Sequence, residues 1–289
     1  MARAQTQRGR RQCKDDDREA TSPAFVVGLG RAFGGALLFA LPMLMTMEMW
    51  SLGFTMAPER LALLLAITFQ LLVGLSRLGG FRVTTRLIDD AADALVALAV
   101  AVVAAALILA LFGLVTPDMA AREIAGKVAL QAVPGSIGAM LARNQLGSAP
   151  KERKESPPGF WEEIFAMVAG ALFVSLNVAP TEEMVLIAHT MSAWQILGLA
   201  AFSLLLMHVI VYAAEFAGGH GHLRPPEARF MGVFVRFTVT GYVVVVGVSF
   251  YLLWSFGRLD GTAFEQALEF ALVLAFPGAL GAAAARLVL

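Results

Sequence analysis

The sequence predicts an all-α, polytopic membrane protein, a bundle of eight transmembrane helices arranged as two parallel four-helix repeats. Apolar residues make up 58% of the 289 residues and charged residues only 15%, and the mean hydropathy is +0.72. Soluble domains have roughly 45–50% apolar and about 25% charged residues. The charges gather at the N-terminus and in a few loops, which leaves long apolar segments. Two of these segments recur in the second half of the chain.

Four apolar segments in the first half are long enough to cross a membrane, which takes about 20 residues. The first predicted helix, 31–54, contains Pro42 and Glu48, and the second, 61–78, begins with a run of Leu and Ala. The third, 91–115, is rich in Ala, Val and Leu. The fourth, 124–141, is the weakest, because it contains one Lys, one Gln and one Pro.

Four further segments predict helices over 164–188, 194–216, 231–256 and 264–287. The seventh contains four consecutive valines, which a lipid-embedded helix tolerates because its backbone must close its own hydrogen bonds. The eighth shares a motif with the weak fourth segment and so supports it.

An internal repeat relates the two halves. Residues 35–49 align with residues 170–184, and the identical pairs are Gly35/Gly170, Ala36/Ala171, Leu37/Leu172, Leu41/Leu176, Thr46/Thr181, Glu48/Glu183 and Met49/Met184. Residues 133–143 and 276–286 share Pro-Gly-x-x-Gly-Ala-x-x-Ala-Arg, and Phe-Gly recurs at 112–113 and 256–257. We therefore expect repeats over 25–146 and 160–289, joined by a linker at 147–159 rich in Pro, Ser and charge. Four spans in each make the repeats parallel.

The N-terminal residues and the loop charges predict the orientation. Residues 1–24 are polar and basic, without the apolar core of a signal peptide, which predicts a disordered cytoplasmic tail. Most of the 22 Lys and Arg residues fall on the side of this tail, as the positive-inside rule requires when both termini are cytoplasmic. The single cysteine, Cys13, excludes an intrachain disulfide.

Glu48 and Glu183 are the candidate functional residues, because a carboxylate inside a span costs on the order of 2.5–3.5 kcal/mol and is retained where it faces an interior or an aqueous path. A pseudo-twofold axis would turn the two towards each other. Oxygen ligands nearby suit a hard cation or a proton. The proposed ion or proton site comprises Glu48, Glu183, Thr46, Thr181, Glu182 and Asn177, and the expected helix breaks are Pro42, Pro180, Pro134 and Pro277. The alternative is that both acids mark the outer ends of their helices.

Other polar residues favour structural interpretations. Acids at the start of the third helix suit the helix dipole better than a cation vestibule. A buried His208 with a polar neighbour is favoured over a relay to Glu215, and His220 with His222 supply too few ligands for a metal. Four alternate methionines over 43–49 spread around the helix, which disfavours copper. Nucleotide-loop, zinc-protease and Gly-x-Ser-x-Gly motifs are absent, so neither enzyme activity nor a cofactor is expected, and the weak rival is a lipid-modifying enzyme.

The pairing of residues 41–50 with residues 177–184 resembles an uncharacterised bacterial family of integral membrane proteins, a domain of unknown function. The resemblance implies a bacterial inner-membrane protein and assigns no functional residues. The paired acids favour a transport protein, a channel or carrier for a cation or proton. The alternative is a non-transporting scaffold or sensor. Expected partners are membrane lipids and the small cation or proton, with no nucleic acid, and a homo-oligomer is compatible with the sequence.

Overall fold

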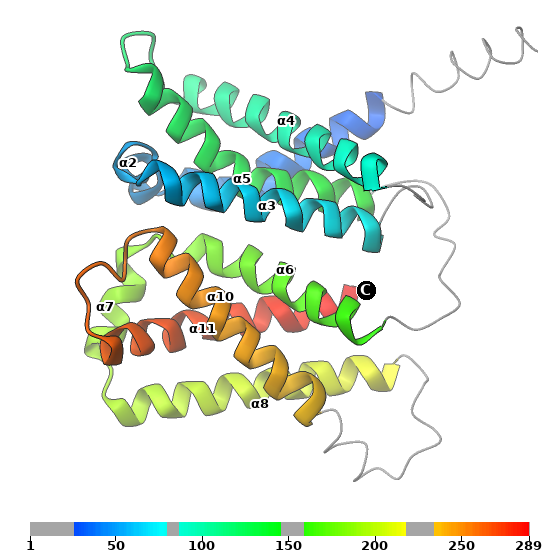
Figure 1. Ribbon diagram of the computed structural model, residues 1–289, viewed down its shortest axis with the longest axis vertical. Coiled ribbons are helices and arrows are strands. Elements are labelled where there is room, and N and C mark those ends of the chain that lie inside the picture. Colours follow the sequence, from blue (N-terminus) through cyan, green and yellow to red (C-terminus); the bar gives the residue numbers. More distant parts are fainter. Residues whose placement is uncertain (1–25, 80–86, 146–158, 218–233, 289) are drawn as a thin grey trace, which may run out of the picture.

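A computed structural model describes residues 26–79, 87–145, 159–217 and 234–288, and the ordered elements in these ranges are helices (Figure 1). Eight of the described helices are long and apolar enough to cross a membrane. This confirms the predicted all-α membrane bundle. The predicted tail, 1–24, lies outside the described residues, and so does the linker except for Gly159, the residue before α6.

The first half begins with an N-terminal helix, Val26–Leu44. It continues with α2 (Met47–Thr55), α3 (Pro58–Gly79), α4 (Leu87–Leu111) and α5 (Ala121–Gln145). The second half comprises α6 (Phe160–Val178), α7 (Glu182–Thr190), α8 (Ala193–Ala217), the π-helical turn η1 (Phe234–Val239), α10 (Thr240–Ser255) and α11 (Phe264–Val288). α2 and α7 have nine residues each and are too short to span a membrane.

The predicted helices 31–54 and 164–188 are each divided in two, which corrects the sequence interpretation. The first break falls at residues 45–46, and the second at 179–181. At each break a threonine hydroxyl donates to a carbonyl three residues earlier, Thr46 to Met43 at 2.9 Å and Thr181 to Val178 at 2.8 Å. The amide of the same threonine donates to this carbonyl as well, Thr46 to Met43 at 3.1 Å and Thr181 to Val178 at 3.0 Å, so each break closes on one carbonyl in the same way.

The prolines do not all break helices as expected. Pro134 and Pro277 lie inside α5 and α11, and Pro42 lies inside the N-terminal helix, which continues to Leu44. Of the four, only Pro180 lies in a break between helices. Helix-breaking residues are tolerated within membrane helices because neighbouring helices and side chains supply partners for the freed backbone groups.

Close helix crossings recur at matching positions in the two halves. The N-terminal helix meets α5 at Gly35 and Gly138, and α6 meets α11 at Gly170 and Gly281. At all four positions an added Cβ would collide with the backbone oxygen of the facing glycine. Small residues let membrane helices approach closely, so that packing holds them together in the absence of a hydrophobic driving force.

The helix ends also match. α4 and α10 are followed by glycines in the left-handed region, Gly113 with φ 70° and Gly257 with φ 73°. The amides that follow donate to equivalent carbonyls, Leu114 to Leu109 and Arg258 to Leu253. A left-handed glycine closing a helix in this way is common because glycine lacks the Cβ that disfavours positive φ. The internal repeat expected from the sequence would produce such paired features.

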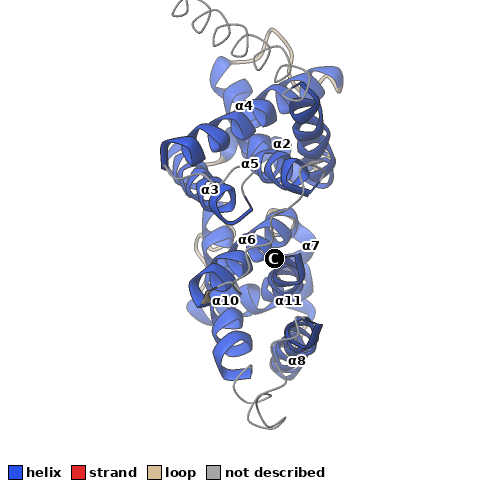
Figure 2. Cartoon of the chain, turned by 90° about the vertical axis from the view of Figure 1, so that its right-hand side faces the viewer, coloured by secondary structure: helices blue, strands red, loops and turns tan. Residues whose placement is uncertain are grey.

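The halves are stacked and follow each other in the same order (Figures 1 and 2). α3, at the lower side of the first half, contacts α6 and α10 of the second half, while α4 and α8 lie at opposite ends of the stack. A pseudo-twofold axis would pair each such contact with an equivalent one, bringing α8 against the first half. The expectation of a twofold arrangement is therefore wrong.

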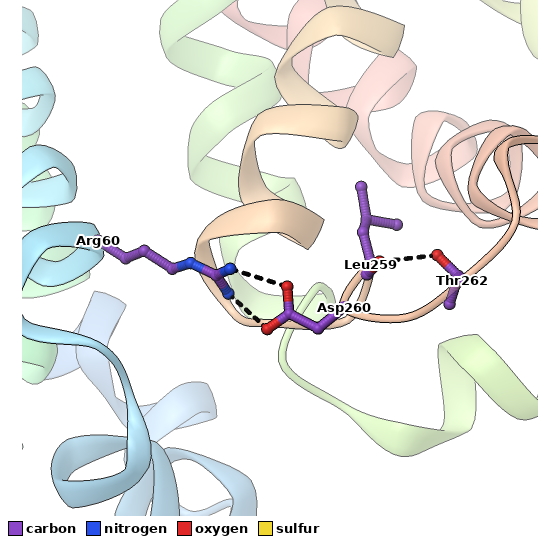
Figure 3. A network of polar contacts seen from close by, with 4 residues as sticks. All are labelled: Arg60, Leu259, Asp260 and Thr262. Atoms are coloured by element: carbon purple, nitrogen blue, oxygen red, sulfur yellow. Dashed lines mark hydrogen bonds and ion pairs between the residues drawn. The ribbon is translucent and has the colours of Figure 1, made fainter.

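A polar clamp and an aromatic pair join the stacked halves. The guanidinium of Arg60 on α3 donates two hydrogen bonds of 2.8 Å to the carboxylate of Asp260, which follows α10 (Figure 3). Arg60 also lies 5.0 Å from the ring centroid of Trp254. Phe39 and Phe173 pack edge to face with centroids 4.8 Å apart. One buried cluster includes residues of both halves, so the two four-helix units share a core.

Candidate ion site at the distal end

α2 and α7 lie at the end of the bundle opposite the C-terminus, which we call the distal end (Figure 1). Each helix starts after a threonine with extended backbone, Thr46 or Thr181. Each is anchored by a methionine only 2% exposed, Met49 or Met184. Because the helices have equal length and the same start, Glu48 and Glu183 occupy the same position in the first turn of each.

The surroundings of the two glutamates differ. Glu48 is half-buried, and its carboxylate makes no hydrogen bond or ion pair with the described residues. Glu183 is exposed at an open pocket of about 530 Å³. The pocket is lined by Glu182, Glu183, Val185, Leu186, His189 and Arg258, and Glu48 is not part of it. We call it the distal pocket.

The structure does not bring Glu48 and Glu183 into one shared interior pocket, contrary to expectation. α2 packs against α5 and α7 packs against α11, so each acidic helix belongs to its own half. The stacking of the halves is the physical reason, because it places equivalent helices one above the other along the stack.

Arg258 is the positively charged residue of the distal pocket, and the sequence interpretation did not include it in the site. Its Nη2 donates to the carbonyl of Pro180, and its Nη1 lies 3.9 Å from Oε1 of Glu182, whose side chain is 79% exposed. Its Nε is buried without a hydrogen-bond partner among the described residues. The available sequence signal was its place directly after the repeated Phe-Gly pair. With one guanidinium beside two carboxylates, the pocket keeps an excess of negative charge.

Asn177 lies in the last turn of α6, close to the break before α7. Its Nδ2 donates to the carbonyl of Phe173 at 2.8 Å, while its Oδ1 is buried and has no partner in the described part of the chain. Of the predicted site residues, Glu182, Glu183, Asn177 and Thr181 thus gather around the α6–α7 break, whereas Glu48 and Thr46 stand at the corresponding break of the other half.

Further buried polar side chains lie in the interior of the second half. Ser175 is fully buried on α6, and its hydroxyl has no hydrogen-bond partner among the described residues. The buried hydroxyl of Tyr242 on α10 interacts with Ser203. Closer to the C-terminal end, Nδ1 of His208 lies 2.9 Å from Oγ1 of Thr238. We call this set the polar column, comprising Asn177, Ser175, Tyr242, Ser203, His208 and Thr238.

The polar column belongs to the second half alone. Its counterparts in the first half are mostly apolar, namely Pro42, Ala40, Leu98, Thr68, Val73 and Ala94 in the same order. His208 pairs with Thr238, as the favoured interpretation of a satisfied buried histidine predicts. The side chain of Glu215, the partner in the alternative relay, lies outside the described residues.

A comparison with protein families places this chain. The family model described as "Putative integral membrane protein (DUF2391)" matches residues 28–289. The chain belongs to this family. The match spans both halves and confirms the resemblance found in the sequence. Comparisons with curated proteins and with solved structures found no match.

Several buried charges of this family member are paired. Nζ of Lys127, a residue 7% exposed on α5, lies 2.7 Å from Oε1 of Glu123. The carboxylate of Asp90, 1% exposed near the start of α4, lies 3.4 Å from Nε of Arg77. At the C-terminal end of the second half, Arg286 and Glu163 are 2.8 Å apart. Within the described ranges no three His, Cys, Asp or Glu side chains group to hold a metal ion, and His220 and His222 lie outside them.

Proposed function

We propose that this integral membrane protein transports a proton or a small cation through its second half, from the distal pocket along the polar column. The observation that carries the proposal is the pair of buried oxygen atoms without partners at Asn177 and Ser175, in a half that also buries the polar side chains of Tyr242 and His208. Buried polar groups are normally hydrogen-bonded, and an unpaired one costs about 1–3 kcal/mol. Polar groups persist inside a membrane protein where they face a hydrated or functional path. Water or the transported species would supply the missing partners.

The chemistry of the polar column favours a proton over a metal cation. Hydroxyl, amide and imidazole groups both donate and accept hydrogen bonds, as a proton relay requires. A hard divalent cation such as Ca²⁺ takes six to eight oxygen ligands, more than these scattered side chains supply at one level. At the distal pocket, the excess negative charge of Glu182 and Glu183 raises the local concentration of cations.

The direction of the path follows from the sequence. The excess of Lys and Arg on the side of both termini supports a cytoplasmic location for the C-terminal end. The resemblance to a bacterial family supports an inner-membrane location, and the charge distribution then leaves the distal pocket open to the outside. Protons would then pass from the acidic pocket towards the ion pair of Glu163 and Arg286 near the cytoplasm.

Proton flux in proteoliposomes with an internal pH dye tests the proposal. The double variant Glu182→Gln/Glu183→Gln is expected to lower the flux about tenfold or more, since charge focusing changes access rates on this scale. Tyr242→Phe is expected to lower it as well, because the relay loses its hydroxyl. Glu48→Gln is the matched control and is expected to retain most of the flux, since Glu48 lies outside the distal pocket. Unchanged flux in both test variants would refute the proposal.

A non-transporting scaffold or sensor is the second candidate function. The buried ion pairs Lys127–Glu123 and Arg286–Glu163 favour it, because paired charges are also what a static membrane bundle retains. This candidate predicts no proton flux above that of empty liposomes for the natural protein. It further predicts that deletion of residues 1–24, and not the acid substitutions, abolishes the cellular phenotype of the gene.

A further inference from the structure

The stacking of the halves leaves one helix surface uncovered at each end of the stack. The equivalent surfaces in the middle of the stack cover each other. Within the molecule, α3 of the first half covers α6 and α10 of the second. The corresponding cover for the N-terminal helix and α4 would be a helix equivalent to α3. That equivalent is α8, which lies at the opposite end of the stack in both views (Figures 1 and 2).

Equivalent residues of the two halves differ in exposure where the cover is missing. In the second half, Leu176 is 0%, Ser255 1% and Phe256 4% exposed. Their counterparts in the first half are Leu41 at 39%, Leu111 at 70% and Phe112 at 49%. Leu176 and Phe256 belong to the buried cluster that also contains the leucines of α3. The uncovered apolar face of the N-terminal helix and α4 is thus equivalent to the face of α6 and α10 that α3 covers.

This uncovered face contains a cavity of about 90 Å³ between the N-terminal helix, α4 and α5. Its lining is small and apolar and includes Ala36, Ala40, Leu41, Ala101, Ala105 and Ile108. The four alanines are themselves buried and Leu41 is exposed, whereas the counterparts in the second half are all buried: Ala171, Ser175, Leu176, Val245, Ser249 and Leu252. Membrane helices associate through close packing at small residues, so this face is suited to another helix.

The exposed face of α8 has residues at the positions equivalent to those through which α3 contacts the second half. On α3, two residues that reach the second half lie fourteen positions apart: Arg60, which binds Asp260, and Gly74, whose added Cβ would strike the ring of Phe165. The equivalent positions on α8 are Gln195 and Val209, with Phe202 between them. Phe202 is 51% and Val209 55% exposed, and Gln195 is exposed as well.

We propose that copies of this chain associate head to tail, with α8 of one copy packing on the N-terminal helix and α4 of the next, as α3 packs on α6 and α10 within one copy. Size complementarity supports the register. The internal contact of Gly74 with Phe165 becomes Val209 against Gly30, and an added Cβ at Gly30 meets nothing within 4 Å. The internal ion pair becomes Gln195 with Thr116, two uncharged polar residues. Such a heterologous interface forms a ring or an open row in the membrane plane.

Cysteine cross-linking of the full-length protein in membranes tests this interface. Cys13, the natural cysteine, is first replaced by Ser. Gly30→Cys/Val209→Cys and Thr116→Cys/Gln195→Cys are each expected to give dimers and a ladder of higher species with a short bis-maleimide. Each single-cysteine variant is expected to remain monomeric on the gel, because a head-to-tail contact joins two different surfaces.

Gly30→Cys/Trp194→Cys is the matched control. Trp194 is 83% exposed on α8 but lies 15 residues before position 209, about 22 Å along the helix axis. Random collision would cross-link this pair as well as the test pairs, whereas the proposed interface would leave it unlinked. Absence of linkage in both test pairs would overturn the proposal and indicate that this face contacts lipid. Dimers from a single-cysteine variant would also overturn it and indicate a symmetric contact.

Discussion

Lys127 shows how one residue differentiates the two halves. In the first half, its side chain lies under α2, where Nζ contacts Glu123, the carbonyl of Leu114 at 3.1 Å and the Phe54 ring at 5.8 Å. The equivalent position in the second half is Phe270, 2% exposed, whose ring packs edge to face on His189 at 5.2 Å. α2 therefore rests on a buried charge and α7 on a buried ring, although the helices match in length.

The pairing of Lys127 predicts the effect of neutralising its partner. Glu123→Gln is expected to lower the stability by about 1–3 kcal/mol, because a buried ammonium loses its carboxylate. Thermal unfolding in detergent would measure this as a lower Tm. Lys127→Met combined with Glu123→Gln is expected to recover much of the loss, since no uncompensated charge remains. Equal stability of the natural protein and Glu123→Gln would show that the pair makes no net contribution.

Among the elements, the helix crossings depend on individual glycines. Gly35 and Gly138 allow the N-terminal helix to touch α5, and their counterparts Gly170 and Gly281 do the same for α6 and α11. At each crossing the two backbones approach so closely that any residue larger than glycine would collide. The packing of these helix pairs in each half therefore depends on these four glycines.

Gly35→Leu is expected to destabilise the bundle by about 1–3 kcal/mol or more, because the added side chain forces the two helices apart. The matched control is Gly34→Leu on the same helix, where an added Cβ meets nothing within 4 Å and the new side chain would face lipid. Size-exclusion profiles and Tm values in detergent would compare the two variants. A Gly34→Leu protein less stable than Gly35→Leu would contradict the assignment of the crossing.

On the scale of the whole molecule, the Arg60–Asp260 clamp connects the halves at the distal end. The hydrogen bonds from Arg60 hold the pKa of Asp260 below its usual value of 3.8, and the nearby positive charge acts in the same direction. Because the folded pKa is the lower one, the clamp stabilises the protein at pH values above about 3.8. This contribution is lost as the pH falls through the folded pKa.

The stability difference between the natural protein and Asp260→Asn should therefore depend on pH. A small loss in Tm is expected near pH 7, small because the Asp260 side chain is 59% exposed and solvent screens the pair. The difference is expected to shrink as the pH falls below about 3.8, where the unfolded chain takes up a proton at this carboxylate, and to vanish below the still lower folded pKa. A difference that persists unchanged at pH 3 would show that the clamp does not act through the charge of Asp260.

The amino-acid sequence alone determined the membrane bundle, the number of its spans and the equivalence of Glu48 with Glu183. These properties depend on the transfer of each residue into lipid and on local identity, which a linear sequence contains. The sequence predicted the first break at Pro42, whereas the helix continues to Leu44 and ends where the hydroxyl and amide of Thr46 both bond to the carbonyl of Met43.

Only the tertiary structure decided the stacking of the halves, and with it the separation of the two glutamates. The stacking depends on how well several helix surfaces fit one another. A helix face that is exposed in one half and its equivalent that is covered in the other differ in too few residues for hydropathy to distinguish them. The polar column was hidden for a related reason. Asn177, Ser175 and Tyr242 lie on two helices far apart in the sequence, and only the packing of the helices around them buries their polar atoms.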